Sequence, residues 1–444
     1  MYTGPSQLWF DSCETCSAKA VVHTGAVTMK SRIRFLFEML RSKFWLLPAA
    51  ITTFLLGLNL LINSVGNPAG ITLGSVNETA RLVSTEGQRI ILSSIAGVVI
   101  TVVGVLFSIT VVVLQQVSAQ YSPRVIENFR RSLQSQGILG VHLGTFGFAI
   151  LQLEQLNSET EKSLPIGTLI VIGLAVICLF SITYYIHYLT QSIKSNTILA
   201  NIRDESIQAI KDLAREFQGF HAVSTEDIRS DLSHRHVIRS DKAGYLQDIR
   251  WDKLKTVLKE TASVLEVERT AGDYINFNMT LLSVRSQKPL PKPLEEKIRN
   301  LFSIGITRTH TQDIKFGIRQ MVDVAQKALS PGINDPTTSV EVLNEIGNVL
   351  VHLNQLETGL GILKFEGEST LVIHQPRFIE LIELSFNEIL VSGRNFVVVL
   401  RRVEQVLSFL IQEARDPSHI QVLEEKKVAA QAALAKARGR DLYV

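Results

Sequence analysis

Four long apolar stretches stand out in the first half of the chain. The clearest, residues 92–114, holds 23 residues without one Asp, Glu, Lys or Arg. A run of about 20 apolar residues is long enough to cross a bilayer as a helix. The other three stretches also lack these charged side chains and cover residues 45–65, 137–153 and 166–190. The pattern therefore indicates a membrane protein with a lipid bilayer as its surroundings.

The distribution of basic residues favours four crossings, including the third stretch, which is only 17 residues long. With the N-terminus inside, twelve Lys and Arg residues flank the inner ends of the spans, whereas the outer loops hold three, Arg81, Arg89 and Lys162. This asymmetry follows the positive-inside rule, and omitting the third span would place the last four basic residues outside. We therefore predict four transmembrane helices with both termini in the cytoplasm.

Small or polar residues form a stripe along the second span, at alternating spacings of three and four. The stripe consists of Ser94, Gly97, Thr101, Gly104, Ser108, Gln115, Ser118 and Ser122, and Val111 interrupts it. We expect it to face something other than lipid. One alternative is a pore shared by several subunits, and the other is a packing seam of small residues between helices. The length of the stripe, which exceeds one helix crossing, favours the pore.

His142 is a titratable side chain well inside a predicted span. A polar residue at this depth is by default a functional candidate. The alternative is an imidazole that is hydrogen-bonded between helices. The spans contain no carboxylate, which argues against a proton-coupled transporter that uses a carboxylate relay.

After residue 190 the pattern changes to that of a soluble region. Apolar residues at helical spacing predict a helical extension over 192–218. Short β-like runs between residues 236 and 286 predict strands, and Gly272-Asp273-Tyr274-Ile275 resembles the half-motif of a barrel-sandwich hybrid, the fold of lipoyl carriers and membrane-fusion adaptors. No lysine occupies the hairpin position that a swinging-arm carrier needs. We interpret residues 234–288 as a structural β module that the prolines of KPLPKP end.

Residues 313–350 predict two helices around one turn. Ser330-Pro331-Gly332 ends the first helix, and the second begins with Asp335 as N-cap and Pro336 in its first turn. A group of polar residues is dense enough here to form a cytoplasmic site: Arg319, Gln320, Asp323, Asn334 and Asp335. The alternative is that these residues only stabilise the corner, where a cap is worth about 0.5–2 kcal/mol.

The predicted fold class is an α-helical membrane domain of four transmembrane helices joined to an α+β cytoplasmic region, with a small barrel-sandwich-like β module and a helical domain. A hairpin near Gly367 and a helical pattern over 378–410 complete that region. The predicted boundaries are a disordered tail at 1–29, the membrane domain at 30–191, the helical extension at 192–218, the β module at 234–288, the helical domain at 294–415 and a charged helix at 416–444.

Motifs for catalysis and cofactor binding are missing from the sequence. There is no GxxxxGK[ST], HExxH or GxSxG, and Cys13 with Cys16 supplies only two of the four ligands of a structural zinc. The three cysteines fit a reducing compartment. We expect no enzyme, cofactor, metal or nucleic-acid partner. The alternative, a membrane-bound enzyme that uses Arg319, Asp323, Asn334 and Asp335, needs a substrate-sized pocket at the helix corner. Met29, which opens the basic run MKSRIRF, is an alternative start to Met1.

Two segments resemble a known family. They are GIRQMVDVAQKALSPGINDPTTS and IAGVVITVVGVLFSITVVVLQQVSAQYSPRVIENF. Together they resemble an uncharacterised family of predicted bacterial integral membrane proteins, known only as a domain of unknown function, over about residues 30–415. The resemblance implies a bacterial inner-membrane location and no catalytic residues. The hypothesis is an oligomeric channel whose second span lines the path and whose cytoplasmic domain regulates it. The alternative is a non-conducting sensor or scaffold with a ligand- or partner-binding cytoplasmic domain.

Overall fold

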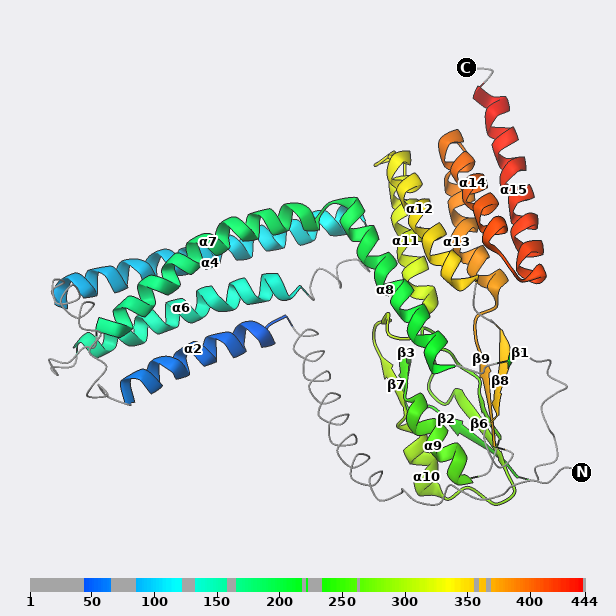
Figure 1. The fold of residues 1–444 in the computed structure, drawn as a ribbon, viewed down its shortest axis with the longest axis horizontal. Coiled ribbons are helices and arrows are strands. Elements are labelled where there is room, and N and C mark those ends of the chain that lie inside the picture. The colour runs from blue at the N-terminus through cyan, green and yellow to red at the C-terminus, as the bar shows by residue number, and fades with distance from the viewer. Residues whose placement is uncertain are drawn as a thin grey trace, which may run out of the picture. The chain divides into compact units, whose positions relative to one another are not determined.

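The computed structural model describes residues 44–64, 85–121, 132–157, 165–217, 221–222, 234–261, 264–354, 359–364 and 369–441 (Figure 1). Contacts divide the chain into two compact units. The first contains residues 1–115 and 126–190, and the second contains residues 116–125 and 191–444. The predicted tail and the tip of the predicted hairpin, at Gly367, lie outside the described residues.

Four long helices account for the first unit, and each is long and apolar enough to cross a membrane. They are α2 (Leu46–Ser64), α4 (Thr85–Gln120), α6 (Leu133–Asn157) and α7 (Pro165–Ser192). They coincide with the four predicted spans, and Figure 1 shows them as a bundle of elongated helices. The prediction of a helical membrane domain is confirmed at this level.

The third span, α6, is the innermost helix of the bundle. Half of the apolar stretch of α6 is buried inside the protein, against 11–17% of the corresponding stretch in each of the other three helices. Phe148 and Ala149 of α6 are fully buried and pack in one apolar cluster with Leu92 of α4 and Val171 of α7. A helix surrounded by protein needs less lipid-compatible surface than its neighbours. This position explains why the third stretch is the shortest and least apolar of the four in the sequence.

The second unit combines two β-sheets with two groups of helices. Its strands are β1 (His221–Ala222), β2 (His234–Arg239), β3 (Gly244–Ile249), β4 (Val264–Val267), β5 (Tyr274–Ile275), β6 (Thr280–Ser286), β7 (Phe302–Gly305), β8 (Leu360–Lys364) and β9 (Thr370–His374). Its helices are α8 (Ser195–Glu216), α9 (Trp251–Thr261), α10 (Lys292–Arg299), α11 (Ile314–Ala328), α12 (Pro336–Leu353), α13 (Phe378–Ser392), α14 (Val397–Glu413) and α15 (Pro417–Asp441). The predicted α+β character is confirmed.

The predicted barrel-sandwich hybrid is not confirmed. The described strands form a six-stranded sheet in the order β1-β8-β9-β4-β6-β2 and a three-stranded sheet in the order β5-β3-β7. Strand β4 pairs in parallel with β9, with Val264 opposite Thr370. The larger sheet thus combines strands that precede α11 and α12 in the sequence with strands that follow them, whereas the sequence pattern suggested a module of consecutive strands. The boundaries of the predicted domains stay a prediction.

Gly272 owes its place to a buried carboxylate rather than to a carrier hairpin. Its φ is +94°, and a Cβ there would overlap the side chain of Asp313. Asp313 caps α11 by accepting a hydrogen bond from the Lys315 backbone N–H and pairs with Arg308. Burial raises the pKa of the Asp313 carboxyl, and the Arg308 guanidinium opposes that shift. Glycine is the residue that accepts both the positive φ and this close approach.

The helices α11 to α15 gather at one end of the second unit, and the strands with α9 and α10 lie at the other end (Figure 1). His419 of α15 stacks on Phe378 of α13, with 3.8 Å between the ring centroids, and its Nδ1 donates to Oδ1 of Asn354 at 3.1 Å. Burial lowers the pKa of the His419 imidazole. A neutral imidazole therefore joins these helices.

Candidate functional site

The stripe of small residues lies on an exposed face of α4. Ser94, Gly97, Thr101, Gly104 and Ser108 are all exposed. No heavy atom beyond the helix's own backbone lies within 4 Å of a Cβ built on either glycine. The stripe is thus not a packing seam within the described part of one chain. It is open to lipid, to a pore or to another copy of the protein.

Two hydroxyl groups of this face, those of Thr101 and Ser108, are bonded to their own helix. Thr101 Oγ1 donates to the Gly97 carbonyl at 2.8 Å, and Ser108 Oγ donates to the Gly104 carbonyl at 2.9 Å. Each hydroxyl oxygen keeps lone pairs that can accept from or contact a cation. Thr101 and Ser108 therefore offer oxygen acceptors at two levels of the span, while their hydroxyl hydrogens are bonded to the helix backbone.

The lower part of the stripe is placed less uniformly. Gln115 is exposed, Ser118 is half-buried, and Ser122 lies outside the described residues. The interruption at Val111 is exposed as well. The structure therefore brings five of the eight predicted stripe residues, Ser94 to Ser108, onto one continuous open face, with Gln115 exposed further along the same helix.

A true glycine seam occurs on α6 instead. A Cβ on Gly140 would lie 2.9 Å from Cα of Pro48, and a Cβ on Gly144 would lie 2.5 Å from Cδ1 of Leu55, both on α2. A third glycine, Gly147, meets Leu56 in the same way. These spacings of four and three let the backbones of α2 and α6 approach closely, as small residues do in membrane helix pairs.

Amide side chains add a polar lock to the α2–α6 pair. Asn59 is fully buried, and its Nδ2 donates to Oε1 of Gln152 at 3.3 Å. Gln155 and Asn63 both donate to Oδ1 of Asn59, at 3.3 Å and 3.0 Å. Such interhelical hydrogen bonds average about 0.6 kcal/mol in membranes. The cluster is a packing device, because these hydrogen bonds all join residues of α2 and α6.

His142 is fully buried in the membrane unit and has one bonded ring nitrogen. Its Nδ1 lies 2.8 Å from the Ile138 carbonyl. Its Nε2 has no hydrogen-bond partner among the described residues. A cavity of about 240 Å³ adjoins this ring and lies between α4, α6 and α7. Its lining is Ser94, Ile95, Val98, Val99, Val102, His142, Ala175, Cys178, Leu179 and Ile182.

The predicted polar corner separates into two groups. Arg319 pairs with Asp323 at 2.7 Å and with Glu388 of α13 at 2.5 Å. The hydrogen bond to Glu388 is the main cause that raises the pKa of Arg319. Gln320, next along α11, is fully buried. This first group therefore fixes α11 against α13.

The second group of the corner begins α12. Asp335 accepts from the Thr338 backbone N–H at 3.1 Å, and its carboxyl also bonds the Thr338 hydroxyl, which lowers the pKa of Asp335. Asn334 adopts φ +52°, which suits asparagine in a left-handed turn. The Asp335 N–H bonds the Ala328 carbonyl, which is nine residues beyond Arg319 and hence about 13 Å along the helix axis. Asp335 therefore lies beyond the C-terminal end of α11, whereas Arg319 lies in the second turn of that helix.

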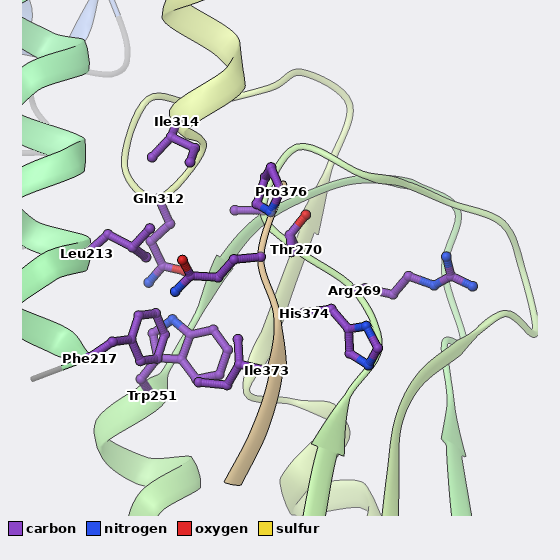
Figure 2. A pocket seen from close by; sticks show the side chains of 12 residues that line it. Leu213, Phe217, Trp251, Arg269, Thr270, Gln312, Ile314, Ile373, His374 and Pro376 are labelled. Carbon is purple, nitrogen blue, oxygen red and sulfur yellow. The ribbon is translucent and has the colours of Figure 1, made fainter. Parts of the chain in front are cut away.

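A small pocket in the second unit lies where α8, the start of α9 and β9 approach one another (Figure 2). Leu213, Phe217, Trp251 and Ile373 make one wall, and Gln312 reaches in from the turn before α11. The volume is about 30 Å³, which suits one or two waters rather than a substrate. The Nε1 of Trp251 is buried without a partner in the described residues, so a water there would satisfy it.

Metal chemistry finds no support within the described ranges, where no three His, Cys, Asp or Glu side chains are arranged to hold an ion. Cys13 and Cys16 lie outside these ranges. Cys178 is buried, and its thiol donates to Oγ1 of Thr145 at 3.4 Å.

Residues 41–408 match the sequence family described as Predicted membrane protein (DUF2254). The chain belongs to this family. Uncharacterized proteins of Mycobacterium tuberculosis and Mycobacterium bovis are each 26% identical to it over 438 residues, which is 94% of this chain and 80% of either relative. No solved structure matches the chain. The resemblance to an uncharacterised family of membrane proteins is confirmed.

Sequence reasoning missed two features of this DUF2254 protein, and each had a signal. The glycine seam was visible as Gly140, Gly144 and Gly147 in the third and shortest apolar stretch. The amide lock was visible as Asn59 and Gln152 inside or beside apolar stretches. By contrast, no local signal linked Arg319 to Glu388, since the two residues come together only when α11 packs on α13.

Proposed function

We propose that this protein forms an oligomeric ion-conducting pore in which the exposed faces of α4 from several copies surround one path. The observation that carries the proposal is the open face from Ser94 to Ser108. Glycine and hydroxyl side chains give lipid little apolar surface to contact, so lipid is the least favourable neighbour for this face. Another copy or a water-filled path suits it better.

The chemistry of this face suits a cation more than an anion. The Thr101 and Ser108 hydrogens are directed to backbone carbonyls, which leaves the oxygen lone pairs as the groups that face outward. Rings of oxygen atoms replace part of a cation's hydration shell in known filters. In the proposed assembly, repetition of these residues around an axis would supply such rings.

The second candidate is a non-conducting sensor or scaffold. The spacing of Gly97 and Gly104 also suits direct helix packing between copies, which excludes a path. The separate second unit, with its own core and pocket, suits regulation in the first case and ligand or partner binding in the second. Both proposals place the protein in the bacterial inner membrane with its two termini in the cytoplasm.

The test is flux of K⁺, Na⁺ and Cl⁻ through the purified full chain in liposomes. Thr101→Val removes one proposed path oxygen with little change in volume, and Ser108→Ala removes the other without adding bulk. Thr190→Val is the matched control, because Thr190 on α7 is also exposed and donates to its own helix, at Ile186. A pore predicts cation flux that the two α4 variants change and the control leaves intact.

Assembly is measured on the same samples by native mass spectrometry. Gly104→Leu should disrupt the oligomer in both proposals. Absence of flux at every voltage and membrane tension, with an oligomer that Gly104→Leu abolishes, would reject the pore and retain the scaffold. A monomeric wild-type protein would reject both.

A further inference from the structure

We infer that the cavity beside His142 binds an apolar alcohol or phenol dissolved in the membrane, whose hydroxyl group donates a hydrogen bond to His142 Nε2. The cavity is separate from the α4 stripe except at Ser94, which borders both. Binding there is independent of whether the protein conducts ions.

The hydrogen bonds of the ring decide the type of ligand. A backbone carbonyl can only accept, so the 2.8 Å contact with Ile138 assigns the proton to Nδ1 of His142. In the neutral imidazole Nε2 is then a lone-pair acceptor. A ligand with an O–H group complements it, whereas a ketone, an ester or an ether does not.

The burial of this acceptor supplies the driving force. His142 is fully buried, and its Nε2 has no partner among the described residues. A buried polar group without a partner costs free energy that a bound donor recovers. The thiol of Cys178, the other polar group deep in the lining, already donates a hydrogen bond to Thr145. Nε2 is thus the group that orients the ligand.

The size and lining of the cavity limit the apolar part of the ligand that it can bind. A cavity of about 150 Å³ lined by aliphatic side chains binds benzene, and this one measures about 240 Å³. The volume admits a six-membered ring or a comparable aliphatic segment. Val98 and Leu179 at the rim are 63% and 65% exposed, so an alkyl tail can leave the cavity towards the lipid.

The probe pair is 4-octylphenol and 4-octylanisole, which differ by one methyl group on the oxygen. Their binding to the full-length protein in lipid nanodiscs is measured with tritiated 4-octylphenol and competition. The expected result is an affinity for the phenol about tenfold higher than for the anisole after correction for lipid partitioning, the factor that corresponds to 1.4 kcal/mol. Equal affinities would overturn the inference and indicate an ordinary acyl-chain groove.

Variants locate the site. His142→Phe should abolish the preference for the phenol, and His142→Gln, which keeps an acceptor, should retain part of it. Ala175→Leu fills the cavity and should weaken both probes, while Val176→Leu, at an exposed neighbouring position, should change neither. A preference that survives both His142→Phe and Ala175→Leu would refute the site. If His142→Phe does not fold, the wild-type comparison and the Ala175→Leu and Val176→Leu pair still decide.

Discussion

Replacing glycine by alanine on α6 and on α4 should have opposite effects on the membrane unit. A Cβ on Gly140 would lie 2.9 Å from Cα of Pro48 and 3.1 Å from Cβ of Ile51, and neither atom can rotate away. A Cβ on Gly104 meets nothing within 4 Å. The two substitutions are chemically identical, so their difference isolates the close approach of α2 and α6.

The expected magnitude follows from two opposing terms. Overpacking costs about 1–3 kcal/mol, and exchanging glycine for alanine inside a helix returns about 0.5–1 kcal/mol. Gly140→Ala should therefore lower the free energy of unfolding by up to about 2.5 kcal/mol. Gly104→Ala should raise it by about 0.5–1 kcal/mol in the dissociated chain.

Thermal unfolding in detergent can be followed through Cys178, which is buried in the same unit. With Cys13 and Cys16 replaced by serine, it is the only thiol in the chain, so a thiol-reactive fluorophore reports the opening of this unit alone. A change of 1 kcal/mol shifts the midpoint by about 2–4 °C in domains of this size. A Gly140→Ala midpoint equal to or above that of Gly104→Ala would refute the seam.

Three predictions concern the second unit. Removing the cap with Asp335→Ala should lower the free energy of unfolding by about 0.5–2 kcal/mol. Because the pKa of Asp335 is lowered in the folded protein, the cap stabilises fully above pH ~4 and loses its effect at lower pH. Urea melts of wild type and variant at pH 7 and pH 3.5 measure both effects. Arg308→Ala leaves the buried carboxyl of Asp313 without its cation and should cost about 3–5 kcal/mol, whereas Arg377→Ala removes an exposed pair and should stay within about 0.5 kcal/mol; similar losses in urea melts would contradict the burial argument. His419 has a lowered pKa in the folded protein, so its contribution to stability is complete above the unfolded pKa of ~6.5 and declines as the pH falls below that value. His419→Gln should therefore reduce the loss of unfolding free energy between pH 7 and pH 5, and an unchanged loss would attribute this pH dependence to another group.

Periodicity and length were enough to predict the membrane helices, because a bilayer imposes both on any span. The helix pair at 313–350 was also predictable, since Asp335 and Pro336 act within one turn of their own helix. These are local effects that the sequence displays directly.

Partners that are distant in the sequence were not predictable. The parallel pairing of β4 with β9 joins residues 264–267 to residues 370–373, and nothing in either strand specifies the other. The two groups of the polar corner illustrate the same limit. Arg319 and Asp335 are close in the sequence, but the rigid rise of α11 separates them, and Arg319 finds Glu388 on another helix. Proximity along the chain was therefore a poor guide to proximity in space.

The inner position of α6 has a consequence for how the protein is made. Gly140, Gly144, Gly147 and the Gln152 amide of α6 contact α2, and a helix with such residues gains less from lipid than α4 does. The ribosome synthesises α2 before α6, so the α2 surface that carries Asn59 is already present when α6 leaves the ribosome. We therefore expect insertion of the third span to depend on its packing against α2.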